Sequence, residues 1–381
     1  MHIVADENIP LLEAFFAGFG SLTRLPGRSI SRAVLDGADV LLVRSVTQVT
    51  AQMLENTTVR FVGTCTIGTD HLDLPGLEKA GIQVASAPGC NARGVVEYVL
   101  SCLLTFAERS GQDWQDKVVG ILGVGEVGSR LADTLGNLGV RTLLCDPLRA
   151  ERGEAGFVDL ETLIALADVI TCHVPLTRSG AHPTWHLLNS GRLGSLKAGA
   201  WLINSSRGPV VDNQALCDLL GARQDLLIAL DVWEQEPSVS SLLAARCGIA
   251  TPHVAGYSLD GKLRGTAQIY QAFCQFLNVP VALSLDNLLP AAGTGQLKLS
   301  TPTPERWLLA KALRCVYDVR DDDARFRAML ADALDDQARR AGFDSLRKHY
   351  PLRRECSSLR VEVDESQEPA RRLLCAAGFR L

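Results

Sequence analysis

The sequence has little excess charge and no long apolar run, and both absences narrow its possible functions. Its 381 residues carry 38 Lys and Arg against 43 Asp and Glu, a net charge of −5, so we expect no basic surface for nucleic acid. No apolar stretch approaches the roughly 20 residues that span a bilayer, so no membrane partner is expected. The first residues, Met1–Glu7, lack the basic start and apolar core of a signal peptide. These features predict a cytoplasmic protein.

The eleven cysteines also lack a recognisable pattern. They are scattered from Cys65 to Cys375 without a CxxC pair, which disfavours a disulfide framework or a zinc site in a chain of this size. We expect reduced, buried thiols.

Two other clusters resemble metal sites only superficially. His182 and His186 are spaced like metal ligands, but Pro183 disfavours one continuous helix, and no acidic or cysteine partner accompanies them in the sequence. The run Asp321–Asp323 is interpreted as a solvated helix start, where negative charge complements the helix dipole, rather than as a cation site. We therefore expect no bound metal.

Short apolar runs alternate with helix-like segments, the pattern of strand–helix–strand units and parallel sheets. The length predicts two or three domains, because it exceeds what one core usually organises. A long helix is expected from Arg93 to Arg109, with a domain boundary along it. Strands are expected at Ile3–Ala5, Val40–Val43, Arg60–Val62 and Gln83–Ala85 in a first block, and at Val118–Leu122, Val140–Cys145, Val169–His173, Trp201–Asn204, Leu227–Leu230 and Gly248–Ala250 in a second.

After about Asn278 the pattern changes to that of a smaller module. The predicted fold class is therefore α/β, with two doubly wound parallel-sheet domains plus a small C-terminal α+β module. In the module, strands are expected at Leu313–Val319 and Ser358–Val363 and helices at Asp323–Arg340 and Pro369–Ala377, after a linker that contains Gly293, Gly295, Pro302 and Pro304.

The cofactor signal is a glycine-rich turn between a strand and a helix. Gly123, Gly125 and Gly128 follow the run Val118–Leu122, so the backbone can approach a pyrophosphate at the helix N-terminus. A lone GxGxxG is a weak signal, and a plain glycine turn is the alternative. Asp146 ends the next strand, about twenty residues further on. A carboxylate there can accept hydrogen bonds from the ribose hydroxyls and would repel a 2′-phosphate, which favours NAD over NADP. Its alternative role is a solvated turn residue.

Three polar residues follow later strands of the second block. Arg207, Glu236 and His253 lie beyond consecutive strand ends, where ligands of open parallel sheets bind. Oxidation of a secondary alcohol needs a base, a group that orients it and a cation for the substrate carboxylate, which His, Glu and Arg can supply. Taken singly, each residue has a structural alternative. The alternatives are a salt bridge for Arg207, a solvated acid for Glu236 and a capping histidine for His253. Together, beyond a dinucleotide motif, they predict a catalytic set.

The arrangement resembles the D-2-hydroxyacid dehydrogenase family over roughly Val40 to Gly265. The resemblance implies substrate orientation by Arg207 and proton transfer by His253 paired with Glu236. It also implies NAD binding by Gly123, Gly125, Glu126, Val127, Gly128, Asp146, His173, Pro175, Ser206, Arg207, Gly208, Asp231 and Gly256. The motifs that carry it are Gly123–Gly128, His173–Thr177, Asn204–Gly208, Asp231–Pro237 and Pro252–Gly256. Ser206 departs from the alanine of many members, and we expect it to be tolerated.

The resemblance also implies a domain division. Residues 1–92 and 257–280 would form the catalytic domain, 93–256 the Rossmann NAD-binding domain, and 285–381 a C-terminal module that forms a homodimer. With fewer than 100 residues, this module has a thin core that would gain from burying a face against a second copy. A regulatory small-molecule domain is the alternative for the module.

Within the family, further segments resemble the members that oxidise a phosphorylated four-carbon hydroxy acid in pyridoxal phosphate biosynthesis. Candidate substrate-binding residues are Arg44, Ser45, Thr66, Arg93 and Tyr257. A dehydrogenase for phosphoglycerate or hydroxypyruvate and an NAD-sensing scaffold remain the alternatives. The segments are Ile67–Asp73, Ala87–Ala92, Val95–Val99, Cys145–Pro147 and Ala255–Tyr257.

Overall fold

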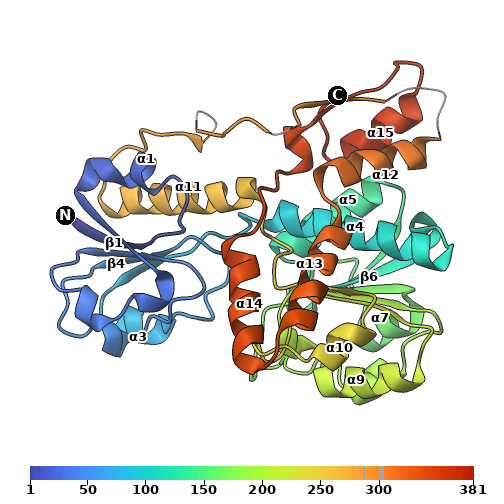
Figure 1. Cartoon of the computed structure of the whole chain (residues 1–381), viewed down its shortest axis with the longest axis horizontal. Coiled ribbons are helices and arrows are strands. Elements are labelled where there is room, and N and C mark those ends of the chain that lie inside the picture. Colours follow the sequence, from blue (N-terminus) through green and yellow to red (C-terminus); the bar gives the residue numbers. More distant parts are fainter. Residues whose placement is uncertain (286–287, 293, 300–303) are drawn as a thin grey trace. The chain divides into compact units, whose positions relative to one another are not determined.

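The computed structural model describes residues 1–285, 288–292, 294–299 and 304–381 (Figure 1). The chain forms two compact units, Met1–Ala92 with Ser258–Ala291, and Arg93–Tyr257 with Ala292–Leu381. Each unit is built on a parallel sheet, which confirms the predicted fold class. Gly293 and Pro302 of the expected linker lie outside the described residues.

The first unit contains a five-stranded parallel sheet in the order β2-β1-β3-β4-β5. Strand β3 (Val40–Val43) is buried on both faces, as expected of an interior strand with an uninterrupted apolar run. The edge strand β2 (Ser21–Leu25) was not predicted, because its polar, partly exposed residues give no apolar run. The other strands, all predicted, are β1 (His2–Asp6), β4 (Phe61–Thr64) and β5 (Gln83–Ala85).

Helices cover both faces of this sheet. Helices α1 (Leu12–Phe16) and α11 (Leu259–Phe276) pack on one face through an aromatic cluster that includes Phe61 and Phe273. Helix α11 begins after Ser258, whose hydroxyl accepts a hydrogen bond from Gly261 N at 3.0 Å. Helices α2 (Ala51–Leu54) and α3 (Leu74–Lys79) contribute to the core on the opposite face.

The second unit contains a six-stranded parallel sheet in the order β11-β10-β9-β8-β6-β7. The strand order reverses between β6 and β8, and ligands of such sheets bind outside the strand ends at that switch point. All six strands were predicted to within one residue at either end. They are β6 (Val118–Leu122), β7 (Arg141–Cys145), β8 (Val169–Cys172), β9 (Trp201–Asn204), β10 (Leu227–Leu230) and β11 (Ile249–Ala250).

Helices again cover both faces of the sheet. One face is covered by α4 (Ala92–Ser110), the predicted long helix, and by α5 (Glu126–Asn137), which follows the glycine turn. The opposite face is covered by α7 (Leu160–Leu166), α8 (Ser190–Gly194), α9 (Asn213–Ala222) and α10 (Ser241–Arg246). The short helix α6 (Pro147–Glu151) follows β7.

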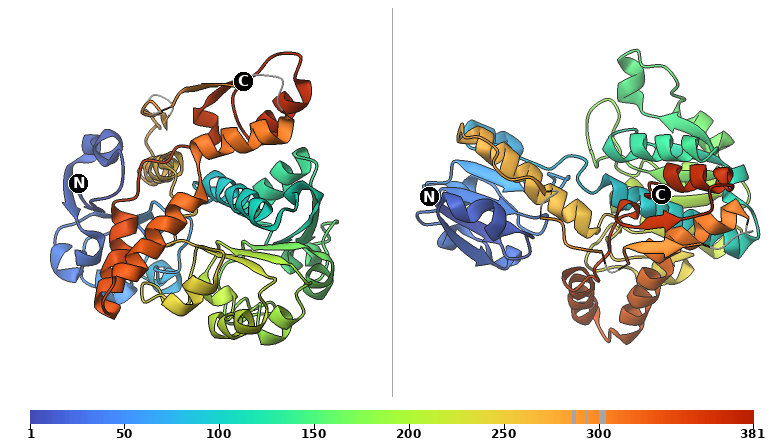
Figure 2. Two further views of the ribbon diagram at one scale, coloured as in Figure 1. Left: turned by 45° about the vertical axis from the view of Figure 1, so that its right-hand side comes forward. Right: turned by 90° about the horizontal axis from the view of Figure 1, so that it is seen from above.

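The C-terminal segment is more helical than predicted. The strand expected at Leu313–Val319 is wrong: this stretch ends helix α12 (Glu305–Val316), where Leu309 and Leu313 are buried one turn apart. Strand β13 (Arg360–Glu362) instead pairs with β12 (Gln296–Lys298). The single helix expected at Asp323–Arg340 is divided into α13 (Val319–Asp332) and α14 (Asp336–Lys348), which lie side by side (Figure 2), and α15 (Glu368–Ala376) is the predicted last helix.

This segment completes the core of the second unit. Leu308 and Leu374 join the cluster that contains Leu131 of α5, and Phe326 of α13 lies 5.8 Å from the ring of Trp233. The segment therefore shares its hydrophobic core with the second sheet.

Two expectations about polar residues need correction. Asp322 and Asp323 are buried rather than solvated: Asp322 accepts hydrogen bonds from Tyr317 and Tyr350, each at 2.8 Å, and Asp323 accepts one from Ala250 N at 2.7 Å. All eleven cysteines are free, but Cys315 and Cys375 are exposed, because they lie on the outer faces of α12 and α15. No helix among the described residues is long and apolar enough to cross a membrane.

Candidate active site

The three glycines of the turn after β6 meet different steric demands. Gly123 has a φ of 85°, and a side chain there would lie 2.7 Å from Cγ1 of Val174. A side chain at Gly128 would overlap the carbonyl oxygen of Gly123, so this glycine permits close packing of α5 on the strand. Gly125 has no atom within 4 Å of its missing side chain, which leaves its backbone open to a ligand.

A cavity of about 630 Å³ opens beside this turn. Asp146 lies on its wall, where Oδ2 accepts a hydrogen bond from Val124 N at 2.9 Å and Oδ1 accepts one from Arg149 N at 3.2 Å. The carboxylate is thus fixed at the end of β7, where it also caps α6. The cavity is lined by Val124, Gly125, Glu126, Ser129, Arg130, Asp146, Leu148, Arg149 and Arg152.

Glu126 and Val127 face different surroundings at the start of α5. Glu126 is half-exposed and forms an ion pair with Arg130 at 2.7 Å, whereas Val127 packs against the core. The acidic charge in the first turn suits the helix dipole, so Glu126 has a structural task here.

The loop after β9 is held by Asn204. Its Oδ1 accepts hydrogen bonds from Ser206 N at 3.1 Å and Ser206 Oγ at 2.8 Å, and its Nδ2 donates to Arg207 O at 3.0 Å. The serine that departs from the alanine of many family members therefore adds a hydrogen bond within the loop. A side chain at Gly208 would overlap the backbone of Trp233, so this glycine lets the Arg207 loop pack against the loop after β10.

Asp231 organises the loop after β11 from the end of β10. Its Oδ1 accepts hydrogen bonds from Thr251 Oγ1 at 2.6 Å and Val254 N at 2.8 Å, and Oδ2 accepts one from Ala255 N at 2.9 Å. Burial raises its pKa, and the hydrogen bonds and the His253 charge oppose that change. Asp231 is only 1% exposed, and its hydrogen bonds position the loop that carries His253.

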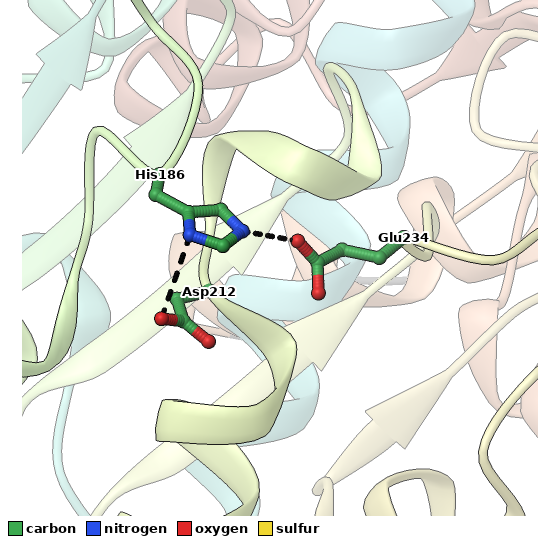
Figure 3. A group of neighbouring side chains, drawn as sticks. All are labelled: His186, Asp212 and Glu234. Carbon is green, nitrogen blue, oxygen red and sulfur yellow. Dashed lines mark hydrogen bonds and ion pairs between the residues drawn. The ribbon is translucent and has the colours of Figure 1, made fainter.

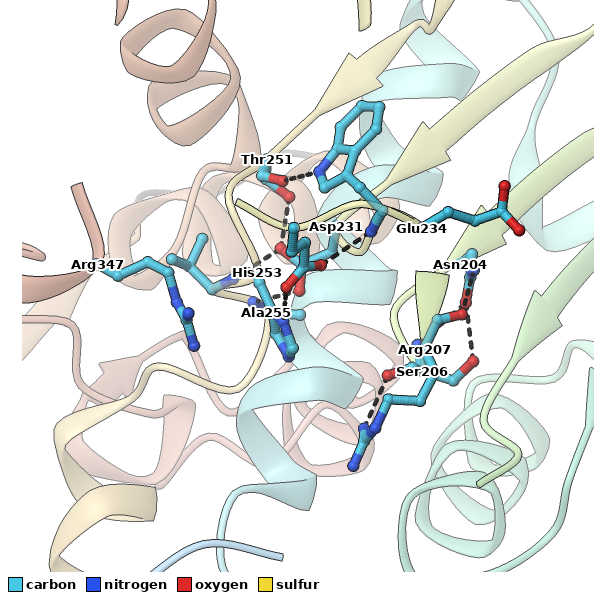
Figure 4. Close-up of polar contacts among 12 residues, drawn as sticks. Asn204, Ser206, Arg207, Asp231, Glu234, Thr251, His253, Ala255 and Arg347 are labelled. Atoms are coloured by element: carbon cyan, nitrogen blue, oxygen red, sulfur yellow. Dashed lines mark hydrogen bonds and ion pairs between the residues drawn. The ribbon is translucent and has the colours of Figure 1, made fainter. Parts of the chain in front are cut away.

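His253, which is labelled in Figure 4, forms a hydrogen-bonded pair with Glu236. Nδ1 of His253 lies 2.7 Å from Oε2 of Glu236, and Oε1 of the glutamate accepts a hydrogen bond from Trp233 N at 2.9 Å. Burial alone would raise the pKa of Glu236, but His253, Arg347 and the Trp233 N–H together lower it. A carboxylate at Nδ1 favours a proton there, so Nε2 is the nitrogen able to exchange a proton with a ligand.

His173 is a second histidine near these strand ends, but its properties differ. Its Nε2 lies 2.9 Å from Thr171 Oγ1, and burial lowers its pKa to about 3. The ring is therefore neutral at physiological pH and suits contact with a cofactor better than proton transfer. Nearby Pro175 is exposed, and its carbonyl accepts a hydrogen bond from Thr184 Oγ1 at 2.5 Å.

The candidate substrate residues of the first unit lie at adjacent strand ends. Arg44 and Ser45 follow β3, and Thr66 follows its neighbour β4. Arg44 Nε lies 3.1 Å from the buried Asp6 Oδ2, and Thr66 Oγ1 lies 2.8 Å from Thr64 Oγ1. Ser45 is exposed.

Arg93 has well-defined partners within its own unit. It lies in the second unit, where its guanidinium forms an ion pair with Glu97 at 3.1 Å and donates to the carbonyl of Ala377. These contacts attach the C-terminal end of the chain to α4, and substrate binding by Arg93 stays a prediction.

His186 has the acidic partners that the sequence did not indicate. Nδ1 lies 3.5 Å from Asp212 Oδ2, and Nε2 forms a hydrogen bond with Glu234 (Figure 3). The three residues are grouped closely enough to suggest metal ligands. However, the two carboxylates lie at opposite ring nitrogens, so metal binding would require one of them to be displaced. The cluster instead links the loops that follow Arg207 and precede Glu236.

Curated relatives match the whole chain. The proteins named erythronate-4-phosphate dehydrogenase from Pseudomonas fluorescens and Azotobacter vinelandii are each 56% identical, over 100% and 99% of both chains respectively. The chain belongs to the erythronate-4-phosphate dehydrogenase branch of the D-2-hydroxyacid dehydrogenase family. The family model for the D-isomer specific 2-hydroxyacid dehydrogenase NAD binding domain matches residues 104–255, and a domain of unknown function, DUF3410, matches residues 288–375.

Solved structures share the fold of this dehydrogenase. D-lactate dehydrogenase from Aquifex aeolicus, in complex with NAD and lactic acid, gives a TM-score of 0.61 at 23% identity, covering 73% of this chain and 96% of that one. An NAD-bound 3-phosphoglycerate dehydrogenase from Entamoeba histolytica gives a TM-score of 0.63 at 22% identity with the same coverage. The protein is thus an NAD-dependent oxidoreductase that oxidises a hydroxy acid.

The residues present fit an NAD molecule. Open space at Gly125 and the fixed carboxylate of Asp146 lie on one cavity of the second unit, as a pyrophosphate and an adenosine ribose require. Sequence analysis did not identify Arg347. This residue lies on α14, 111 residues after Glu236, and its positive charge helps to lower the pKa of that glutamate. No motif marks this arginine, because its position depends on how α14 packs.

Proposed function

We propose that this enzyme oxidises 4-phospho-D-erythronate to 2-oxo-3-hydroxy-4-phosphobutanoate, with NAD as hydride acceptor, in pyridoxal 5′-phosphate biosynthesis. The observation that carries the chemistry is the 2.7 Å contact between His253 Nδ1 and Glu236 Oε2. The substrate assignment is supported by the name of the full-length relatives.

His253 accepts the proton of the substrate hydroxyl at Nε2. Glu236 orients the ring through Nδ1 and stabilises the imidazolium that forms. The carbon–hydrogen bond at C2 breaks as a hydride leaves, and the alcohol becomes a carbonyl. NAD, when bound, supplies the hydride acceptor. The products are the 2-oxo acid, the reduced cofactor and one proton, which His253 releases to water.

Arg207 binds the substrate carboxylate and faces the oxygen at C2. Its planar guanidinium matches a carboxylate and stabilises negative charge on the reacting oxygen. Asn204 and Gly208 hold its loop against the loop that leads to Glu236, so that the cation and the base keep a fixed spacing. Gly256 and Tyr257 lie three and four residues after His253, and we assign them to the cofactor and the substrate, respectively.

The phosphate end of the substrate requires donors away from the reacting carbon. Ser45 and Thr66 offer hydroxyl groups at adjacent strand ends, and Arg44 adds a positive charge beside them. We assign these three residues to substrate binding.

A panel of acids tests this function. Purified protein should reduce NAD with 4-phosphoerythronate far faster than with erythronate, 3-phosphoglycerate or glycerate, as followed by cofactor absorbance. The reverse reaction should prefer the corresponding 2-oxo acid over hydroxypyruvate. A preference for phosphoglycerate or hydroxypyruvate would replace the proposed substrate, and NAD binding without any turnover would favour a sensing scaffold.

We also propose that the enzyme is a cytoplasmic homodimer that associates through residues 285–381. The eleven free cysteines suit a reducing compartment. Large apolar side chains are exposed on the C-terminal segment, namely Trp307, Leu334 and Leu352, at 50%, 98% and 68%. We assign these three side chains to the association surface.

A further inference from the structure

Arg347 of α14 contacts Tyr257, four residues after His253 in sequence. Arg347 Nε donates a hydrogen bond to Tyr257 Oη at 3.1 Å, and its guanidinium carbon lies 5.6 Å from the centre of the tyrosine ring. The ring of Phe343, one turn earlier on α14, lies 5.7 Å from the same carbon. Two aromatic rings and one hydrogen bond therefore fix the position of this cation.

The guanidinium of Arg347 keeps its charge, because the carboxylate of Glu236 is engaged by other groups. Both carboxylate oxygens of Glu236 already accept hydrogen bonds, from Trp233 N and from His253. Within the described ranges of the chain, the structure records no ion pair for Arg347. Burial opposes the charged form of the guanidinium, but Tyr257 and Glu236 raise its pKa, so the cation persists.

Arg207 and Arg347 are the two guanidinium groups drawn around His253 in the close-up of this region. In the view of Figure 4, Arg207 and Arg347 lie on opposite sides of His253; Arg207 extends from the loop after β9 and Arg347 from helix α14. A substrate with an anionic group at each end and a hydroxyl near one of them matches this order of charges. The carboxylate adjoins the reacting carbon, whereas the second anion is two carbons further away.

We propose that Arg347 binds the phosphate of the substrate, so that the C-terminal segment supplies a specificity-determining residue to the active site. The inference rests on the proposed function, in which Arg207 takes the carboxylate. With Nε directed at Tyr257, the two Nη groups are the donors available to a dianion, and a guanidinium can hold two phosphate oxygens at once.

The test compares two acids that differ only in the phosphate. Arg347→Met should lower kcat/KM for 4-phosphoerythronate by roughly 30- to 1,000-fold, the range for removing one partner of a desolvated charge pair. The same variant should change kcat/KM for unphosphorylated erythronate by less than about threefold and leave NAD affinity unchanged. Arg347→Lys should recover part of the loss. The matched control is Arg340→Met, an exposed position on the same helix, which should behave as wild type.

The outcomes separate this inference from the proposed function. An equal loss with both acids, accompanied by a shifted pH profile, would mean that Arg347 acts through Glu236 and would overturn phosphate binding. Unchanged kinetics would overturn it as well. If the wild type does not prefer the phosphorylated acid, the proposed function fails. Inhibition by inorganic phosphate then tests whether Arg347 binds a phosphate group. Weaker inhibition of Arg347→Met would support it, and equal inhibition would reject it. Unfolding midpoints establish that each variant is folded.

Discussion

Nδ1 of His253 lies 2.7 Å from Oε2 of Glu236, whose other oxygen accepts a hydrogen bond from Trp233 N at 2.9 Å. The glutamate is therefore held at both oxygens, by the backbone of its own loop and by the base that it orients. This arrangement fixes the ring plane of the histidine before a substrate binds. Preorganisation of this kind lowers the reorganisation needed in the transition state.

The first prediction concerns the base itself. His253→Gln should lower turnover by roughly 100- to 10,000-fold, the usual contribution of general acid–base catalysis, while NAD binding measured by fluorescence persists. His349→Gln, at an exposed histidine that ends α14, is the control and should retain normal turnover. Near-normal turnover of His253→Gln would exclude this histidine as the base.

The second prediction follows from the lowered pKa of Glu236. Because the folded-state pKa lies below the ordinary value of 4.5, the ionised carboxylate stabilises the fold above pH 4.5. That contribution is lost as the pH falls through the lower, folded-state pKa. The difference in unfolding midpoint between wild type and Glu236→Gln should therefore be largest near neutrality and shrink toward pH 3. Glu368→Gln, at an exposed ion pair, should show little difference throughout. A difference that grows on acidification would contradict the assigned direction.

The third prediction concerns cofactor choice. Asp146→Ser should narrow the preference for NAD over NADP by at least about tenfold, since the carboxylate would repel a 2′-phosphate and tenfold corresponds to only 1.4 kcal/mol. Serine can still cap α6, which limits structural damage. The control is Asp159→Ser, because Asp159 caps α7 in the same way, with Oδ1 accepting from Thr162 N at 2.8 Å. An unchanged kcat/KM ratio would place discrimination elsewhere.

The fourth prediction concerns the spacing of Arg207 and Glu236. Gly208→Ala forces a methyl group into the backbone of Trp233, so it should destabilise the protein by roughly 1–3 kcal/mol and lower turnover by displacing Arg207. Gly136→Ala, in a helical position with open space around it, should be neutral or stabilise by roughly 0.4–1 kcal/mol. Denaturant unfolding and kcat/KM measure both effects. A stable and fully active Gly208→Ala variant would show that the loops need not pack so closely.

The fifth prediction concerns association. Light scattering should show a dimer for the full chain and a monomer for a variant that combines Trp307→Glu, Leu334→Glu and Leu352→Glu, because all three side chains are exposed. Point variants are preferable to truncation, since removal of the segment would delete Phe326 and Phe343 from the core of the second unit. A control with Leu166→Glu, an exposed leucine on α7, should remain dimeric. A monomeric wild type would exclude the proposed dimer.

The sequence by itself determined the second sheet and the candidate site residues. Each of the six strands is a short apolar run that ends at a turn or polar residue, so periodicity located β6 to β11 closely. Because the ends of parallel strands meet at one edge of a sheet, the positions of Arg207, Glu236 and His253 in the chain were enough to group them. Local chemistry at the glycine turn likewise indicated the dinucleotide.

Packing between distant segments fixes which polar residues are engaged elsewhere and which distant residues approach the site. Leu309 and Leu313 lie in helix α12, where their four-residue spacing places both on its buried face, a helical signal that the expected strand overlooked. Arg93 is held by Glu97 and the chain end, His186 is held between two carboxylates, and Arg347 reaches Tyr257 from α14. Apart from the i,i+4 pair of Arg93 and Glu97, these relationships join residues that are between 26 and 284 positions apart, so they depend on packing that no local pattern encodes.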